Sequence, residues 1–363
     1  MEKSRDNSID ILRMAAAFLV ILTHTLGSYN IMIINGKLPA SFSMMLLMSL
    51  ADCGVTVFFL ISGAFVLRND ENASFRYFYS HIARTIAIPT IIFSIWYLIY
   101  SLIPAIVRND TGKIWYVLSE TIKGRPYFHM WYLYTLLCLY LFVPAIVRLK
   151  IMVGEKTFSR IAVLIFISSA VSDMTSTHMF QYDPGSAYRY AGYLFAGYLA
   201  YENSEKNTKK AAAILSVWVI AELAAAGVYA VSYDAAFNVH VLNAVDRILS
   251  VTAPVLLFWG FAHIRVRHRV KIVYLSFLIY LLHAGIIDMF SRIFEKLGIG
   301  EKILFILPAP ANVLLITALI YLTSAIAAFV YDKIQVRAEK RFGVRQKLYD
   351  MMNSVFRVFF SIQ

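Results

Sequence analysis

Long apolar stretches recur along the chain, and short polar segments separate them. About 20 consecutive apolar residues in a helix cross the hydrocarbon core of a bilayer, and most of these stretches reach that length. The pattern predicts an all-α, polytopic membrane helix bundle with about ten transmembrane helices, of which the sixth is the shortest. The predicted spans are residues 9–34, 42–67, 85–107, 128–149, 160–178, 187–201, 211–232, 240–263, 271–290 and 303–331.

Basic residues are distributed unevenly over the segments between these spans. The segments on the side of the two termini hold 23 of the 34 Lys and Arg residues, whereas the opposite segments hold eight. Cytoplasmic loops of membrane proteins carry such an excess. The bias supports ten spans in a multi-pass protein of a cell membrane, either a bacterial inner membrane or a plasma membrane, with both termini in the cytoplasm. It also accounts for the formal net charge of +12 without a nucleic-acid partner.

The overall composition agrees with this class. Of the 363 residues, 60% are hydrophobic and 15% are charged, and the mean hydropathy is +0.65, which is far too apolar for a soluble domain. The two cysteines, Cys53 and Cys138, fall inside apolar stretches and form neither a disulfide framework nor a metal signature, so no metal is expected. No cleavable signal peptide is expected, because the first apolar stretch is too long for one.

The last part of the chain differs from the rest. No long linker or internal repeat divides the chain, so residues 1–335 are expected to form one membrane domain. Residues 336–363 are basic and amphipathic, a pattern typical of a helix that lies on the anionic cytoplasmic leaflet and takes membrane lipid as its partner. An ordinary positive tail that fixes the topology is the alternative.

Three polar residues interrupt the first apolar stretch: Asp10, Arg13 and His24. Arg13 and His24 are eleven positions apart, so on a helix they leave from one face, about 16–17 Å apart along the axis. Asp10 stands three residues before Arg13, where a helix brings it alongside. Charges inside a span are costly and mark functional sites by default. The alternative is that Asp10 and Arg13 reach the headgroups while His24 bonds a neighbouring helix.

The expected topology orients this stretch. Arg13 would lie near the cytoplasmic face and His24 toward the outer half of the membrane. A base at the cytoplasmic mouth and a deeper imidazole suit an elongated anionic substrate with a reactive end. An acyl-CoA could place its phosphates near Arg13 and its thioester near His24. The imidazole could then act as general base on an acceptor hydroxyl.

Five motifs occur in an order that resembles the acyltransferase 3 membrane family. The resemblance covers about residues 8 to 331, and the five motifs together are specific although each alone is weak. Ala64 departs from the usual Ser-Gly-Phe, and His81 replaces a residue that is often Arg or Lys. The motifs are Arg13-x10-His24, Phe58-Phe-Leu-Ile-Ser62-Gly63-Ala-Phe65, His81-Ile-Ala-Arg84 with Pro89, His129-Met-Trp131-Tyr132 and Tyr280-Leu-Leu-His283.

The resemblance implies an acyl-CoA-dependent membrane O-acyltransferase. It would take an acyl group, acetyl in the first instance, from cytoplasmic acyl-CoA to a hydroxyl of a surface glycan or lipid-linked saccharide. Acyl-CoA would be a donor substrate, and no bound cofactor is implied. The resemblance makes Arg13 and His24 the essential pair, and it adds Ser62, Gly63 and Arg84 to the site.

Several of these residues have a structural alternative. Ser62 and Gly63 are also typical of a close helix contact, and His129 beside Trp131 suits an interfacial aromatic belt. Asp246 and Arg247 are adjacent charges in the eighth span, where a structural interhelical pair competes with acceptor binding.

Two further titratable residues, His283 and Glu222, lie inside predicted spans, and no substrate or catalytic role is assigned to either. His283 is expected to be a hydrogen-bonded interior histidine, and the sequence identifies no partner for Glu222.

A transporter of a small polar solute or amino acid is the rival function. Arg13, Asp246 and Arg247 would then line its pathway. Transporters commonly contain inverted repeats or paired broken helices, and the sequence contains neither pattern. The acyltransferase is therefore the favoured hypothesis, with Asp10, Ser62, Gly63, Arg84, His129, Asp246 and Arg247 as substrate-binding candidates.

Overall fold

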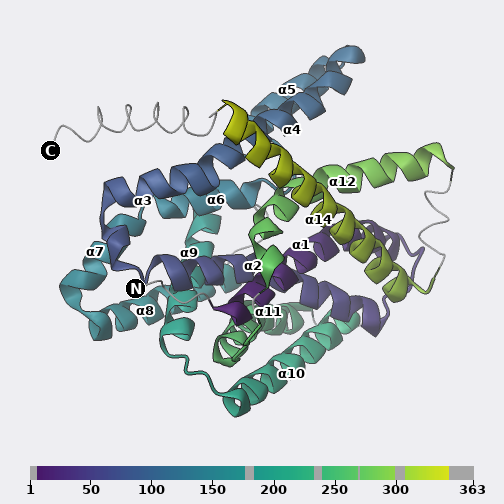
Figure 1. Ribbon diagram of the computed structural model, residues 1–363. Helices are drawn as coiled ribbons and strands as arrows, with labels where there is room; N and C mark the ends of the chain where they lie inside the picture. Colours follow the sequence, from purple (N-terminus) through teal and green to yellow (C-terminus); the bar gives the residue numbers. More distant parts are fainter. Residues whose placement is uncertain (1–5, 176–183, 233–238, 269, 299–306, 343–363) are drawn as a thin grey trace. The chain divides into compact units, whose positions relative to one another are not determined.

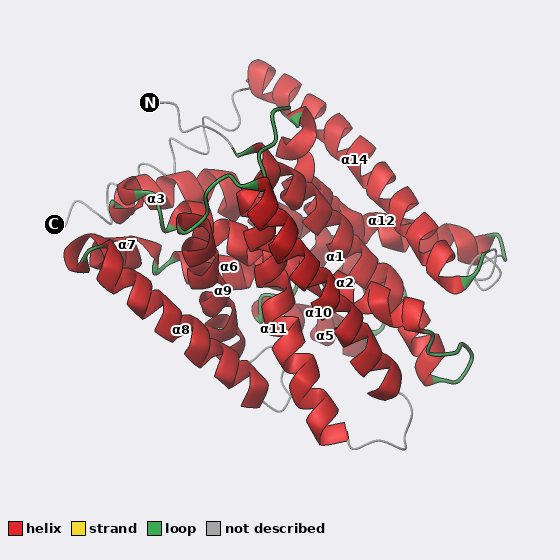
Figure 2. Ribbon diagram, turned by 90° about the horizontal axis from the view of Figure 1, so that it is seen from below, coloured by secondary structure: helices red, strands yellow, loops and turns green. Residues whose placement is uncertain are grey.

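In the computed structural model the chain forms helices joined by short connections, and the described residues contain no strand (Figures 1 and 2). The structure describes residues 6–175, 184–232, 239–268, 270–298 and 307–342. Each of the ten predicted apolar stretches contains helix wherever it is described. The structure therefore confirms the all-α helix bundle.

The chain divides into two compact units. The first comprises Met1–Arg68 and Lys156–Ala328, and the second comprises Asn69–Glu155 and Phe329–Gln363. The helices of the first unit are α1 (Asn7–Ile34), α2 (Phe42–Val66), α8 (Glu155–Thr175), α9 (Pro184–Glu202), α10 (Thr208–Ser232), α11 (Val239–His263), η3 (Lys271–Leu275) and α12 (Ser276–Lys296). Those of the second are η1 (Asp70–Ala73), α3 (Phe75–Ile82), η2 (Ala83–Ala87), α4 (Ile88–Val107), α5 (Thr111–Ile122), α6 (Trp131–Tyr140) and α7 (Val143–Val153), while α14 (Ala309–Phe342) belongs partly to each.

In the part of the chain that the structure describes, fewer than ten helices meet the length and apolar composition needed to cross a membrane. Within the described residues, seven helical segments are long and apolar enough to cross a membrane, or eight if the bent pair α6 and α7 is one span. α8 and α9 are not among these segments. α8 begins with charged residues, and α9 is rich in Tyr and Gly, which lowers its hydropathy. That these two helices cross the membrane stays a prediction.

The expected boundary at residue 335 does not coincide with a helix end. α14 continues to Phe342 without a break. The rest of the basic segment predicted to lie on the membrane surface, residues 343–363, lies outside the described residues.

A polar anchor fixes the start of α1. Asp6 caps the helix by accepting hydrogen bonds from the Ser8 amide (3.1 Å) and hydroxyl (2.6 Å), and the Lys206 ammonium lies 2.7 Å from its other oxygen. The Tyr201 hydroxyl donates to the same oxygen at 2.8 Å, and Lys206 also donates to the Ala262 carbonyl at 2.9 Å. Burial raises the pKa of Asp6, but the hydrogen bonds from Lys206, Ser8 and Tyr201 outweigh it and hold this pKa below its usual value. The anchor ties α1 to the α9–α10 connection and the end of α11.

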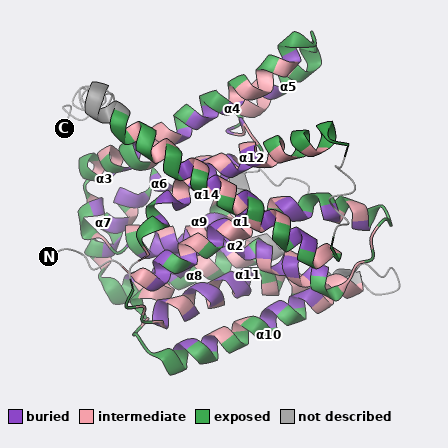
Figure 3. Ribbon diagram, turned by 45° about the vertical axis from the view of Figure 1, so that its right-hand side comes forward, coloured by how far each residue is buried: buried purple, intermediate pink, exposed green. Residues whose placement is uncertain are grey.

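α2 lies at the centre of the first unit. It is the most buried of the candidate spans among the described residues, and its ribbon is mostly purple and pink in Figure 3. Apolar side chains of α1 and α2 interdigitate in a buried cluster that includes Leu26, Tyr29 and Met45.

α2 and α9 approach each other closely along small residues. A Cβ added at Gly63 would lie 2.7 Å from the Leu194 Cα, and one added at Gly197 would lie 2.7 Å from the Leu60 Cα. Both distances are below ordinary van der Waals contact, so the two backbones touch where only glycine fits.

Candidate active site

Arg13 and Asp10 form the pair that their spacing predicts. The Arg13 Nη1 lies 3.4 Å from the Asp10 Oδ1, and Asp10 is buried while the Arg13 side chain is about one third exposed. A buried carboxylate beside an arginine is paired rather than isolated, which limits the cost of placing both in the span. The pair lies one turn inside the start of α1.

The face of α1 between Arg13 and His24 is packed rather than open. Ala17 and Ile21 belong to a buried apolar cluster with Leu275, Ile279 and Ile320, which come from η3, α12 and α14. Because α1 runs without a break from Asn7 to Ile34, helix geometry keeps Arg13 and His24 on this side, about 16–17 Å apart along the axis. α12 therefore covers the face that carries the two residues.

His24 meets a second histidine at the end of this face. Its ring stacks on that of His283 from α12, with centroids 5.4 Å apart and an interplanar angle of 23°. His283 is fully buried, and its Nδ1 lies 2.5 Å from the Tyr280 carbonyl oxygen. Because a carbonyl only accepts hydrogen bonds, Nδ1 of His283 carries the proton. The expectation of a hydrogen-bonded interior histidine is confirmed, but the sequence did not indicate that His283 stacks on His24.

Ser62 and Gly63 lie in the last turn or two of α2, near its C-terminal end. Ser62 is half-buried, and Gly63 is buried against the backbone of α9. The contact supports the alternative that Gly63 allows two helices to approach. A substrate-binding role for Ser62 and Gly63 stays a prediction.

Arg84 belongs to the second unit. It lies in the π-helical turn η2 and is exposed, and its Nε donates to the Ser80 carbonyl at 3.3 Å. π-Helical turns are rare and frequently occur at functional sites. The turn precedes Pro89, the second residue of α4, which has no amide hydrogen to continue the preceding ladder.

His129 also belongs to the second unit, just before α6. It is buried, and its ring meets the rings of Tyr97, Tyr127 and Phe128 at centroid distances of 5.1, 5.9 and 5.6 Å. The Tyr97 and Tyr127 rings stack on each other at 4.4 Å. His129 therefore lies in an aromatic enclosure and not at an exposed rim.

Asp246 and Arg247 lie half-buried in α11. Asp246 lines a small pocket that also contains Asp52 of α2 and Tyr229 of α10. The Tyr229 hydroxyl donates to the Asp52 carboxylate at 2.9 Å. The structure thus brings Asp246 to an acid and a phenol that the sequence analysis did not single out. A signal was present, because Asp52 is a charged residue in the middle of an apolar span.

Glu222 of α10 has partners that the sequence did not identify. The buried carboxylate accepts hydrogen bonds from Ser49, from Cys53 (3.1 Å) and from the Trp218 indole (2.9 Å). Ser49 and Cys53 are one turn apart on α2, so Glu222 joins α10 to α2. These bonds satisfy a buried acid, which is the requirement for keeping one inside a bundle.

Comparison with known proteins identifies the family of the chain. No curated protein and no solved structure shows significant similarity to the chain. A family model described as an acyltransferase domain, that of the acyltransferase 3 family, matches residues 6–330. This match covers the first unit from residue 6 onward, the Asn69–Glu155 part of the second unit, and all the motifs named above. The chain therefore belongs to the acyltransferase 3 family of membrane acyltransferases.

Proposed function

We propose that the protein transfers an acyl group, acetyl in the first instance, from acyl-CoA to a hydroxyl of a surface glycan or lipid-linked saccharide. The observation that carries the proposal is the position of His24, half-buried in the middle of α1 with its ring on His283. Arg13 stands on the same face, eleven residues before it. Family membership supports acyl transfer. Arg13 supports acyl-CoA as the donor, and His24 supports a transfer step that uses a general base.

Arg13 suits the phosphates of the donor. A guanidinium binds phosphate through two parallel hydrogen bonds, and Asp10 holds it at the start of α1. The distance of about 16–17 Å to His24 matches the length of an extended pantetheine arm with its thioester at the imidazole. Because Ala17 and Ile21 between the two residues are packed in a buried cluster, the arm would pass beside them and not over them. His129, Arg84, Asp246, Arg247, Ser62 and Gly63 remain substrate-binding candidates under this proposal.

His24 would act as general base in the transfer step. It takes the proton of the acceptor hydroxyl as the oxygen attacks the thioester carbonyl. The new ester C–O bond forms, the C–S bond breaks, and the proton passes from His24 to the departing CoA thiolate. His283 lies against His24 with its own Nδ1 proton committed to the Tyr280 carbonyl, so it fixes the plane of the catalytic ring.

The proposal includes a direction across the membrane. Both termini would lie in the cytoplasm, as the loop charges indicate. Acyl-CoA would then bind at the Arg13 end of α1, and the acceptor would approach His24 from the other side. In sealed vesicles of known orientation, labelled acyl-CoA on the cytoplasmic side should label an acceptor confined to the opposite side. Labelling that needs both substrates on one side would contradict this direction.

The chemistry is tested with purified protein and acetyl-CoA by following the release of free CoA thiol. His24→Ala should lower transfer by about 10²–10⁴-fold, the usual contribution of a general base. His268→Ala, at an exposed loop histidine, is the matched control and should keep wild-type rates. Wild-type-like transfer by His24→Ala would remove His24 from the mechanism. Solute movement without any CoA release by the wild-type protein would favour the transporter instead.

A further inference from the structure

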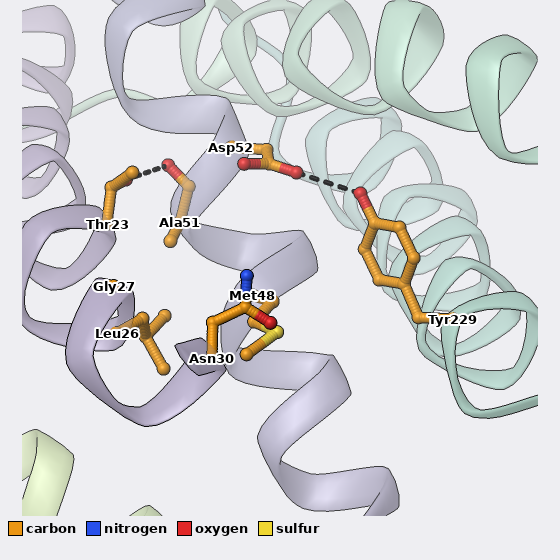
Figure 4. A pocket seen from close by; sticks show the side chains of 8 residues that line it. All are labelled: Thr23, Leu26, Gly27, Asn30, Met48, Ala51, Asp52 and Tyr229. Carbon is orange, nitrogen blue, oxygen red and sulfur yellow. Dashed lines mark hydrogen bonds between the residues drawn. The ribbon is translucent and has the colours of Figure 1, made fainter. Parts of the chain in front are cut away.

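A cavity of about 270 Å³ lies between α1, α2 and α10 in the first unit. Figure 4 shows its lining: Thr23, Gly27 and Asn30 come from α1, Asp52 from α2 and Tyr229 from α10, and three apolar residues complete it. The volume is near the lower end of small-molecule sites, so it suits one ring-sized group and not an oligosaccharide.

The cavity adjoins the stretch of α1 that carries the proposed catalytic base. Thr23, which immediately precedes His24, lines the cavity, and so does Gly27, one turn after Thr23 on the same side of α1. His24 itself stacks on His283 of α12 and does not belong to the lining. Asp52 lies in the middle of the apolar helix α2, yet its side chain is exposed. A carboxylate at this depth faces a polar cavity in membrane proteins and commonly marks a substrate path.

The lining favours a ligand that donates hydrogen bonds. Tyr229 donates to one oxygen of Asp52, and in Figure 4 the second oxygen points away from Tyr229. The single proton of the Thr23 hydroxyl is taken by the Leu19 or the Ala51 carbonyl, each 3.1 Å away, so toward a ligand this oxygen can only accept. Among the described residues that line the cavity there is no Lys or Arg, so the lining is unsuited to phosphates or to other anions.

We propose that this cavity is the acceptor site, that it holds one uncharged sugar ring, and that Asp52 accepts hydrogen bonds from the ring hydroxyls. The proposal rests on the acyltransferase function proposed above, since it places a hydroxyl of the ring toward His24. Tyr229 is a positioning residue, because it fixes the Asp52 carboxylate. Bonds to a carboxylate are about twice as strong as neutral ones, which explains a charged residue in an otherwise apolar helix.

Gly27 offers a direct way to fill the cavity. A Cβ added there meets no atom within 4 Å, and Gly27 lines the cavity, so the side chain of Gly27→Leu starts in open space and takes up cavity volume. Gly227 of α10 is the matched control, because a Cβ added there also meets nothing within 4 Å and the residue does not line the cavity. Asp52→Asn is a second variant, which keeps the shape of the site and removes the charge.

The probes are methyl glycosides of glucose, galactose and mannose, with methyl glucuronide and methyl glucosaminide as charged counterparts. Purified protein receives acetyl-CoA with and without each probe, and acetylated glycoside and free CoA are both measured. We expect at least one neutral glycoside to be acetylated. Gly27→Leu and Asp52→Asn should each lower kcat/KM for that glycoside by about tenfold or more, beyond any change in hydrolysis of acetyl-CoA alone. Gly227→Leu should stay within about twofold of wild type, because its side chain starts in open space outside the cavity lining.

The outcomes separate the two proposals. A wild-type protein that neither hydrolyses acetyl-CoA nor transfers the acetyl group contradicts the acyltransferase function itself. Acetyl-CoA hydrolysis without acetylation of any neutral glycoside overturns the cavity proposal alone, as does an unchanged kcat/KM for the glycoside in both variants. Equal losses of hydrolysis and transfer would assign the cavity to the donor. Acetylation restricted to the glucosaminide, and lost in Asp52→Asn, would replace the uncharged ring with a cationic one.

Discussion

Gly63 either binds substrate or allows α2 and α9 to approach each other, and Gly63→Ala distinguishes these two roles. The added methyl would lie 2.7 Å from the Leu194 Cα of α9 and closer still to that residue's carbonyl group, whereas ordinary contact begins at 3.4 Å. Both neighbours are backbone atoms in helices, so neither can rotate aside. α2 and α9 would have to separate, and overpacking of this kind costs about 1–3 kcal/mol.

Gly27→Ala supplies the reference for this change. Both substitutions gain the same helix propensity, about 1 kcal/mol, but the methyl at position 27 meets nothing within 4 Å. The difference in unfolding free energy between the two variants therefore isolates the clash, and we expect Gly63→Ala to be less stable by about 3 kcal/mol.

The measurement is thermal unfolding of detergent-purified protein, followed by the loss of the monodisperse peak in size-exclusion chromatography. Gly63→Ala should lose this peak at a temperature about 5 °C or more below that of Gly27→Ala. Gly197→Ala, which would place a methyl against Leu60 from the opposite side of the same contact, should behave like Gly63→Ala. If Gly63→Ala instead unfolds with Gly27→Ala but loses transfer, the helix-contact explanation is wrong and Gly63 contacts substrate.

Two other predictions concern the start of α1. Arg13→Lys should raise KM for acetyl-CoA about tenfold and change kcat less, because lysine lacks the planar fork that binds phosphate. Initial rates over a range of acetyl-CoA concentrations measure both constants, and an unchanged KM with a reduced kcat would assign Arg13 a different role. Asp6→Asn should reduce the free energy of unfolding by about 2 kcal/mol, because it leaves Lys206 without its carboxylate. Since the pKa of Asp6 is lowered from 3.8 in the folded protein, this contribution is complete above that value and is lost as pH falls through the folded pKa. Unfolding curves of Asp6→Asn and wild type should therefore differ equally at pH 7 and pH 5, and a difference that vanishes between these values would contradict the assignment.

The sequence predicts most of what lies within single helices. Asp10 and Arg13 meet because a helix brings residues three apart together, and α1 is continuous as its apolar pattern indicates. These features depend on local geometry, which a single stretch of sequence contains. Arg13 and His24 could be proposed as a pair for the same reason, since their spacing places them on one face of α1.

Contacts between helices could not be predicted in this way. His24 and His283 stack although they are 259 positions apart, and Asp52 bonds Tyr229 across 177 positions. Such pairs depend on how α1, α2, α10 and α12 are rotated about their axes, which apolar stretches do not specify because they are hydrophobic all round. For the same reason the partners of Glu222 appear only in the structure. Asp52 could have been flagged as a charge within a span, but its cavity could not.

The two acids inside α1 and α2 face different conditions while the chain is being made. Asp10 brings its counter-ion with it, because Arg13 follows in the same helix. Asp52 enters the bilayer long before Tyr229 has left the ribosome, since 177 residues separate them. A lone aspartate at the centre of a span costs about 2.5–3.5 kcal/mol at the translocon. The other residues of α2, which is strongly apolar on average even with Asp52 included, have to offset that cost during insertion. Substitutions that make α2 less apolar should therefore reduce the yield of inserted protein even where they leave the folded site untouched.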